Sequence, residues 1–251
     1  MKGNYAPEGK VFVVKRFFGE GNSLLKNIAK EAKMLESICH PNITQFIGVC
    51  SKPVAITMDY KCFDFSPFVL NHQISNLLEF LNTLDHIEGE TEAFEHFLPV
   101  FPKAAKDVAE GLCFLHSNDI VHRDLKPSNV LVSSRHYSKK DITADQLPSV
   151  FADCPAVCKL TDFGESRSTL LQTAFIIHAK TMNIERGTKL FVAPEIIPEG
   201  KLNYTAMDDL KAIDIWALGM TFFSIINSDV EFPYEVELNL SSEKLQTWLP
   251  N

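Results

Sequence analysis

Short apolar runs rich in β-branched and aromatic residues mark the first sixty positions of the chain. Residues 10–18 form one such run between two glycines, and residues 43–49 and 54–60 form two more. These residue types pack well on a pleated surface, so each run predicts a β-strand. In the first strand, alternation places Lys15 on the same face as Val13.

Apolar residues recur at helical spacing in three later segments. The first begins at Asn22 or Ser23, either of which is a suitable N-cap, and ends before Pro41. The other two are residues 103–116 and 212–226. The last segment is apolar on every side, which predicts a buried helix.

Strands come early and helices late, an order that predicts an α+β fold with a small β-rich lobe and a larger helical lobe. We expect the boundary near residues 59–63, less regular structure from there to about residue 98, and a short strand at 156–162. At 251 residues, the chain is near the upper size for a single hydrophobic core.

Two charged residues interrupt these apolar patterns. Lys15 lies on the apolar face of the first strand, and Glu31 lies between Ile28 and Leu35 on the apolar stripe of the first helix. Burying either charge alone is costly, but the two can neutralise each other. The alternative is that both are surface side chains whose charged ends reach solvent.

Charge and cysteine content exclude several classes of protein. The formal net charge of −8 disfavours nucleic acid or an anionic membrane surface as the main partner, because both attract a basic face. The N-terminus lacks the apolar core of a signal peptide, and residues 212–226 are too few to span a bilayer. Six scattered cysteines predict a reduced, cytoplasmic protein, and Cys154 with Cys158 are ordinary thiols more readily than a metal site.

Four short motifs follow one another in the second half of the chain. HRDLKPSN occupies residues 122–129, DFG 162–164, APE 193–195 and DIWALG 214–219. In this order the motifs resemble those of the eukaryotic protein kinase family. The resemblance covers nearly the whole chain. Lys126 in the first motif looks like the serine/threonine type, and residues 40–50 and 126–132 lean toward the tyrosine-kinase-like group.

By this resemblance the chain is a bilobal protein kinase domain over residues 1–251. Residues 1–60 would form part of the N-lobe, and residues 61–251 would form the hinge and part of the C-lobe, with an insertion near 133–155. No glycine-rich loop precedes Lys15, and the family's last helices have no counterpart here. We therefore expect the domain to be incomplete at both ends.

The resemblance implies roles for the charged residues of the motifs. Asp124 would accept the proton of the substrate hydroxyl, and Lys126 would contact the transferred phosphoryl group. Asn129 and Asp162 would hold Mg²⁺.

A nucleotide site is implied in the same way. Lys15 resembles the strand lysine that grips the α- and β-phosphates of ATP, and Glu31 resembles the helix glutamate that orients it. The family usually has alanine at the position of Val13, so the adenine pocket would be narrower. The residues expected to line the nucleotide pocket with Lys15 are Val13, Met58, Asp59, Tyr60, Lys61 and Leu131.

Other residues resemble the structural and regulatory elements of the family. Leu35, Phe163 and His122 would stack as part of the regulatory spine, and Asp214 would anchor the catalytic loop. Arg123 suggests control by phosphorylation, since an arginine pairs well with a phosphate group. The candidate phosphorylation sites are Ser166, Ser168, Thr169, Thr173 and Thr181.

We therefore expect a serine/threonine protein kinase that uses ATP and Mg²⁺ and acts on a protein with a serine or threonine hydroxyl. We expect no nucleic-acid partner and no membrane span. The alternative is a weakly active or inactive pseudokinase-like module for binding or scaffolding. The missing glycine-rich loop favours the alternative, whereas the presence of Lys15, Glu31, Asp124, Asn129 and Asp162 disfavours it.

Overall fold

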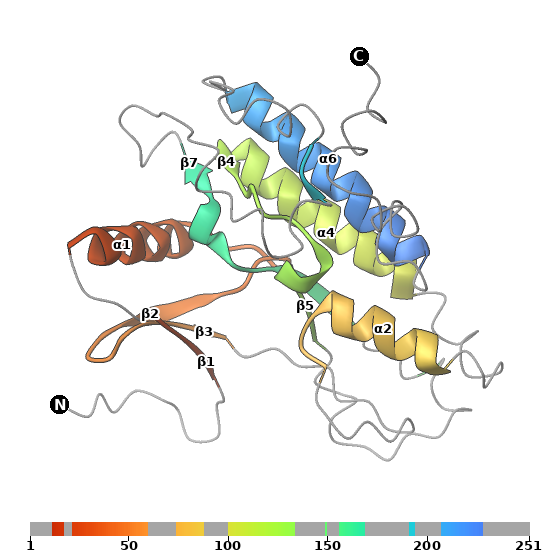
Figure 1. Cartoon of the computed structure of the whole chain (residues 1–251), viewed down its shortest axis with the longest axis horizontal. Coiled ribbons are helices and arrows are strands. Elements are labelled where there is room, and N and C mark those ends of the chain that lie inside the picture. The colour runs from red at the N-terminus through yellow and green to blue at the C-terminus, as the bar shows by residue number, and fades with distance from the viewer. Residues whose placement is uncertain are drawn as a thin grey trace, which may run out of the picture.

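A small antiparallel sheet and one helix form the first part of the molecule (Figure 1). The strands are β1 (Phe12–Arg16), β2 (Phe46–Ser51) and β3 (Val54–Asp59), in the order β1-β3-β2. Helix α1 (Asn22–Ser37) packs against β2 and β3. In this computed structural model, the residues described are 12–17, 22–59, 74–87, 100–133, 149, 156–168, 191–193 and 207–227.

All three strands predicted for this sheet are present, but the second begins later than expected. The prediction that it starts at residue 43 was wrong. Ile43 instead forms a bridge with Leu160, and the Thr44 amide donates to the Leu160 carbonyl at 2.9 Å. The backbone at Ile43 and Thr44 therefore bonds to a strand of the second part of the molecule. For this reason β2 begins only at Phe46.

Helix α1 buries the stripe that its sequence predicted. Ile28 and Leu35 are buried, and Glu31 between them is only 6% exposed. The helix ends at Ser37, whose hydroxyl donates to the Met34 carbonyl at 2.8 Å. A carboxylate on the buried side of α1 requires a cationic partner across the sheet.

Among the described residues, three helices and four short strands form the second part (Figure 1). Helices α4 and α6 lie side by side, and α2 lies against β5. No helix among the described residues has the length and apolar character needed to cross a membrane. The helices are α2 (Leu77–Ile87), α4 (Val100–Ser117) and α6 (Met207–Ile226). The strands pair as β4 (Ile120–Val121) with β7 (Arg167–Ser168) and β5 (Val130–Ser133) with β6 (Val157–Leu160).

Helix α2 corrects the expectation of irregular structure up to residue 98. The Asn76 side chain accepts the Glu79 amide at 2.9 Å, and the Glu79 carboxylate accepts the Ser75 amide at 2.8 Å. These two bonds satisfy amide groups at the start of the helix and just before it. The start of α2 could therefore have been predicted from the sequence. The signal is the pair Asn76 and Glu79 beside the leucines of the helix.

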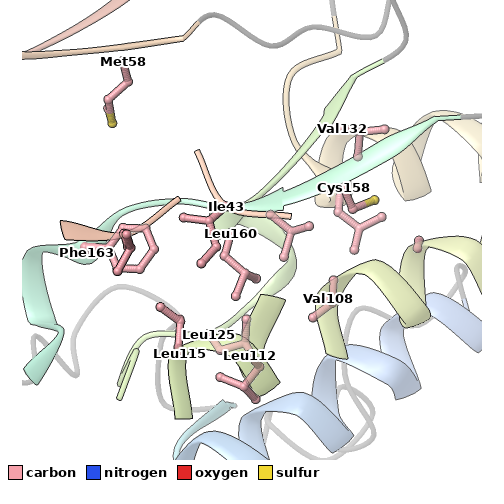
Figure 2. Packing of buried hydrophobic residues seen from close by; sticks show 14 of the residues in the cluster. Ile43, Met58, Val108, Leu112, Leu115, Leu125, Val132, Cys158, Leu160 and Phe163 are labelled. Carbon is pink, nitrogen blue, oxygen red and sulfur yellow. The ribbon is translucent and has the colours of Figure 1, made fainter. Parts of the chain in front are cut away.

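One apolar cluster continues from α1 and the sheet into the second part of the molecule. Figure 2 shows Ile43, Leu160 and Phe163 above Leu112 and Leu125, with Met58 on the sheet side. The loop before β2 is also held by hydrogen bonds. The Asn42 side chain donates to the Cys158 carbonyl at 3.0 Å, and the Leu160 amide donates to the Asn42 carbonyl at 2.8 Å.

Gly111 in α4 permits this close approach. A Cβ atom there would lie 2.8 Å from the Asn42 carbonyl oxygen and 3.1 Å from Leu160 Cδ1. Because a backbone atom cannot move aside cheaply, we expect Gly111→Ala to lower the free energy of unfolding by about 2 kcal/mol. Urea denaturation measures this change.

Gly219→Ala in α6 is the matched control. Nothing lies within 4 Å of a Cβ at Gly219. Alanine is the better helix former, so this variant should be unchanged or more stable by up to about 1 kcal/mol. Equal losses of stability in the two variants would contradict the packing argument for Gly111.

Candidate active site

The loop after β4 brings three of the predicted catalytic residues together. Asn129, at the end of the 3₁₀ turn η1 (Pro127–Asn129), donates from its side chain to the Asp124 carbonyl at 2.7 Å and to Asp124 Oδ2 at 2.8 Å. Lys126 Nζ lies 3.0 Å from the same carboxylate oxygen. Asp124 is thus held by an amide and an ammonium group, with its side chain 17% exposed.

Lys15 joins two carboxylates that are far apart in the sequence. Its Nζ lies 2.8 Å from Glu31 Oε1 and 2.7 Å from Asp162 Oδ1. The predicted neutralisation of Lys15 by Glu31 is confirmed. Asp162 follows β6 in a left-handed conformation (φ 61°) and precedes the 3₁₀ turn η4 (Phe163–Glu165).

Gly164 lies directly beside this cluster. A Cβ there would lie 3.4 Å from Asp162 Oδ1 and 3.7 Å from Lys15 Nζ. Both are ordinary van der Waals distances, so a methyl group at this position would touch the ion pair without overlapping it.

Burial and charge move the pKa values of this cluster in different directions. Burial raises the pKa of Glu31, and the nearby Lys15 only partly offsets that effect. Burial also acts to raise the pKa of Asp162, but Lys15 and the Gly164 amide more than offset it and leave that pKa lowered. Burial acts to lower the pKa of Lys15, while Asp162 and Glu31 raise it above its ordinary value of 10.5.

A pH titration of the chain without nucleotide tests these directions. Carboxyl NMR should give Glu31 a midpoint above its ordinary pKa of 4.5 and Asp162 a midpoint below its ordinary pKa of 3.8. Lys15→Met should raise both midpoints, because it removes the positive charge from both carboxylates. Lys211→Met is the control: Lys211 pairs with Asp119 at 2.8 Å, and its loss should leave both midpoints unchanged.

The same directions fix the signs of the stability changes. The raised pKa of Lys15 contributes stability below pH 10.5, which is lost as the pH rises through the folded-state pKa. The lowered pKa of Asp162 contributes stability above pH 3.8, which is lost as the pH falls through the folded-state pKa. The raised pKa of Glu31 has the opposite sign, so protonating Glu31 in acid relieves a cost of burial.

Asp214 of α6 anchors the catalytic loop from below, as predicted. It is fully buried and accepts the His122 amide and the Arg123 amide, each at 2.7 Å. His116, in the last turn of α4, is a third partner, with Nε2 2.9 Å from Asp214 Oδ2. His116 was not predicted, because nothing in the local sequence pattern indicates a partner ninety-eight residues away.

The three residues expected to stack beneath the site are all buried. Leu35 is 1% exposed, Phe163 2% and His122 0%. The rings of His122 and Phe163 have centroids 5.2 Å apart, and His122 Nε2 lies 3.0 Å from the Thr161 carbonyl oxygen. His122 therefore links the catalytic loop to the segment that carries Asp162.

Two of the five candidate phosphorylation sites are inaccessible. Ser166 is 1% exposed and donates to the His122 carbonyl at 3.1 Å, and Ser168 is 3% exposed within the β4-β7 pair. The Arg123 guanidinium donates to the Glu165 carbonyl at 3.3 Å. The other candidates, Thr169, Thr173 and Thr181, lie outside the described residues.

Residues expected to line the nucleotide pocket come from two strands of the sheet and from β5. Val13 and Met58 are directly opposite each other in the β1-β3 register, and Met58 is buried. Leu131 of β5 is partly exposed and forms a bridge with Asn76 at the start of α2. Asp59 is buried at the end of β3, and the predicted hinge residues Tyr60 and Lys61 lie outside the described residues.

Comparisons with known proteins agree with this geometry. A family model described as the protein kinase domain matches residues 1–248. The chain is 24% identical to Serine/threonine-protein kinase STY46 of Arabidopsis thaliana over 250 aligned residues. These residues make up 99% of this chain and 34% of that protein.

Two further relatives come from other eukaryotes. Cyclin-dependent kinase-like 2 of Rattus norvegicus is 27% identical over 242 residues, which cover 95% of this chain and 38% of that protein. Probable cyclin-dependent kinase 8 of Dictyostelium discoideum is 30% identical over 232 residues, which cover 90% of this chain and 50% of that protein. The chain thus spans about a third to a half of the length of these curated relatives.

Proposed function

Because the chain belongs to the protein kinase family, we propose that it transfers the γ-phosphoryl group of ATP to a serine or threonine hydroxyl of a protein. The observation that carries this proposal is the pair of clusters at the site. Lys15 joins Glu31 to Asp162, while Asn129 and Lys126 hold Asp124. Phosphoryl transfer depends mainly on positioning and on neutralising phosphate charge, which these two clusters are suited to provide.

Asn129 and Asp162 would hold Mg²⁺, as the chemistry of their side chains allows. Both amide N–H contacts of Asn129 go to Asp124, so its amide oxygen is the atom available for a metal. Within the described residues, no group of three or more His, Cys, Asp or Glu forms a self-sufficient metal site. Two oxygen ligands completed by phosphate suit Mg²⁺, which neutralises phosphate charge when bound.

The remaining residues would bind the nucleotide or act on the substrate hydroxyl, according to where they lie in the site. Lys15 would bind the α- and β-phosphates, and Glu31 would keep the lysine oriented. Asp124 would accept the proton of the substrate hydroxyl, while Lys126, 3.0 Å from it, would contact the transferred phosphoryl group. Val13, Met58, Asp59, Tyr60, Lys61 and Leu131 would line the nucleotide pocket.

We also propose that the whole chain is one kinase domain, divided as the sequence predicts. Residues 1–60 would belong to the N-lobe and 61–251 to the hinge and C-lobe, with an insertion near 133–155. The continuous apolar cluster that joins the sheet side to α4 supports a single domain. The leaning toward the tyrosine-kinase-like group stays a prediction.

A phosphoryl-transfer assay tests the proposal. Incubating the chain with ATP labelled at the γ-position, Mg²⁺ and a mixed serine/threonine peptide library should place label on serine or threonine. Chelating Mg²⁺ should abolish the transfer. Nucleotide binding without any transfer, either to peptides or to the chain itself, would instead favour the pseudokinase-like binding module.

A further inference from the structure

Arg123, the residue before Asp124, has an uncommon backbone conformation. Its φ is 69°, in the left-handed region that residues with a side chain rarely adopt. Such a conformation persists only where the surroundings hold it. The orientation of the peptide between His122 and Arg123 therefore decides where the following residue, Asp124, points.

Two hydrogen bonds hold that peptide from opposite ends. Its N–H, on Arg123, donates to Asp214 Oδ1 at 2.7 Å. Its carbonyl, on His122, accepts the Ser166 hydroxyl at 3.1 Å. With both ends fixed, the peptide cannot rotate toward the more common backbone region without losing a bond.

Ser166 lies where its hydroxyl can hold the carbonyl end of this peptide. It is 1% exposed, and its amide donates to the Phe163 carbonyl at 3.1 Å, which closes the turn after Asp162. The same turn gives a second tie to the loop, because the Arg123 guanidinium donates to the Glu165 carbonyl. The Ser166 hydroxyl thus adds to the links that the Arg123 and His122 side chains make between the loop that carries Asp124 and the segment that carries Asp162.

We propose that Ser166 is a positioning residue for phosphoryl transfer, which fixes the His122–Arg123 peptide and thereby aims Asp124. The inference rests on the proposed function. The Ser166 hydroxyl bonds to the backbone carbonyl of His122, which is not among the residues assigned to ATP. It should therefore affect the transfer step more than nucleotide binding.

The test compares Ser166→Ala with Ser224→Ala. Ser224 is a matched control, because it is 2% exposed and its hydroxyl also donates to a backbone carbonyl, that of Met220 at 3.2 Å, but inside α6. Ser166→Ala should lower kcat about fivefold to tenfold, the range expected for one lost hydrogen bond, and leave KM for ATP within about twofold. Ser224→Ala should leave kcat unchanged.

A third variant and a second measurement keep the test independent of folding and of activity. Ser166→Cys retains a similar shape with a weaker donor, so its kcat should lie between those of wild type and Ser166→Ala. Hydrogen exchange at the Arg123 amide should become about tenfold faster in Ser166→Ala and stay unchanged in Ser224→Ala. This exchange is measured without substrate.

The outcomes separate this inference from the proposed function. An unchanged kcat in Ser166→Ala, or a rise in KM for ATP without a fall in kcat, would overturn the positioning role. So would unchanged exchange at the Arg123 amide. If wild type transferred no phosphate but the exchange responded as expected, the proposed function would fail while the control of the peptide by Ser166 would stand.

Discussion

Asp162→Asn is expected to lower kcat/KM for phosphoryl transfer by about a thousandfold or more. The change removes the negative charge that pairs with Lys15 at 2.7 Å and that is proposed to bind Mg²⁺. Stabilisation of phosphate charge by a metal contributes several kcal/mol to the transition state, and each 1.36 kcal/mol is a factor of about ten. Steady-state kinetics with labelled ATP measure the loss.

Asp119→Asn is a closely matched control. Asp119 also has a left-handed backbone, with φ 52° against 61° for Asp162, and it also pairs with a lysine, Lys211, at 2.8 Å. Asparagine tolerates this conformation, so neither change should strain the backbone. Asp119 lies away from the proposed nucleotide site, and its variant should keep kcat/KM within about twofold. A similar fall in both variants, or full activity in Asp162→Asn, would refute the metal-binding role.

Asp214→Asn is expected to lower the free energy of unfolding by about 2–3 kcal/mol, the upper part of the range for leaving a buried hydrogen-bond donor unsatisfied. The Asp214 side chain is fully buried and accepts hydrogen bonds on both carboxylate oxygens. An asparagine offers one acceptor oxygen and turns an N–H group toward a buried donor. Such a loss is a large share of the stability of a typical domain.

Denaturant unfolding and kinetics together test the anchoring role. Asp107→Asn is the control, since Asp107 is also a buried carboxylate and accepts the Cys158 amide at 2.9 Å. Both variants should lose stability, but only Asp214→Asn should also lower kcat, because only Asp214 holds the amides of the catalytic loop. Equal kcat in the two variants, measured under conditions where both are folded, would show that Asp214 merely supports the fold.

Local pattern predicted most of the secondary structure, and its errors have physical causes. The helix α4 and the long helix α6 were expected from periodicity and are present. Helix α2 was missed even though Asn76 and Glu79 carry a start signal. The start of β2 was misplaced, because the backbone of Thr44 bonds to Leu160, a partner that periodicity does not indicate.

In the candidate site too, residues within short motifs were predicted, whereas several contacts between distant segments were not. The resemblance of the motifs to the protein kinase family pointed to Asp124, Lys126, Asn129 and Asp162, because each belongs to a short motif. The contacts among segments did not follow from them. Ser166 was considered only as a phosphorylation site, whereas the structure buries it and bonds its hydroxyl to the His122 carbonyl.

The sequence by itself determined the α+β order of elements, the four motifs and the residue types of the site. It also indicated that Lys15 and Glu31 could neutralise each other, because both interrupt apolar stripes. Only the tertiary structure decided that Lys15 also bonds to Asp162, 147 positions along the chain, and that Asp214 holds the loop that precedes Asp124. Local pattern reflects which face of an element is buried, whereas packing of distant elements decides which charged and polar groups meet there.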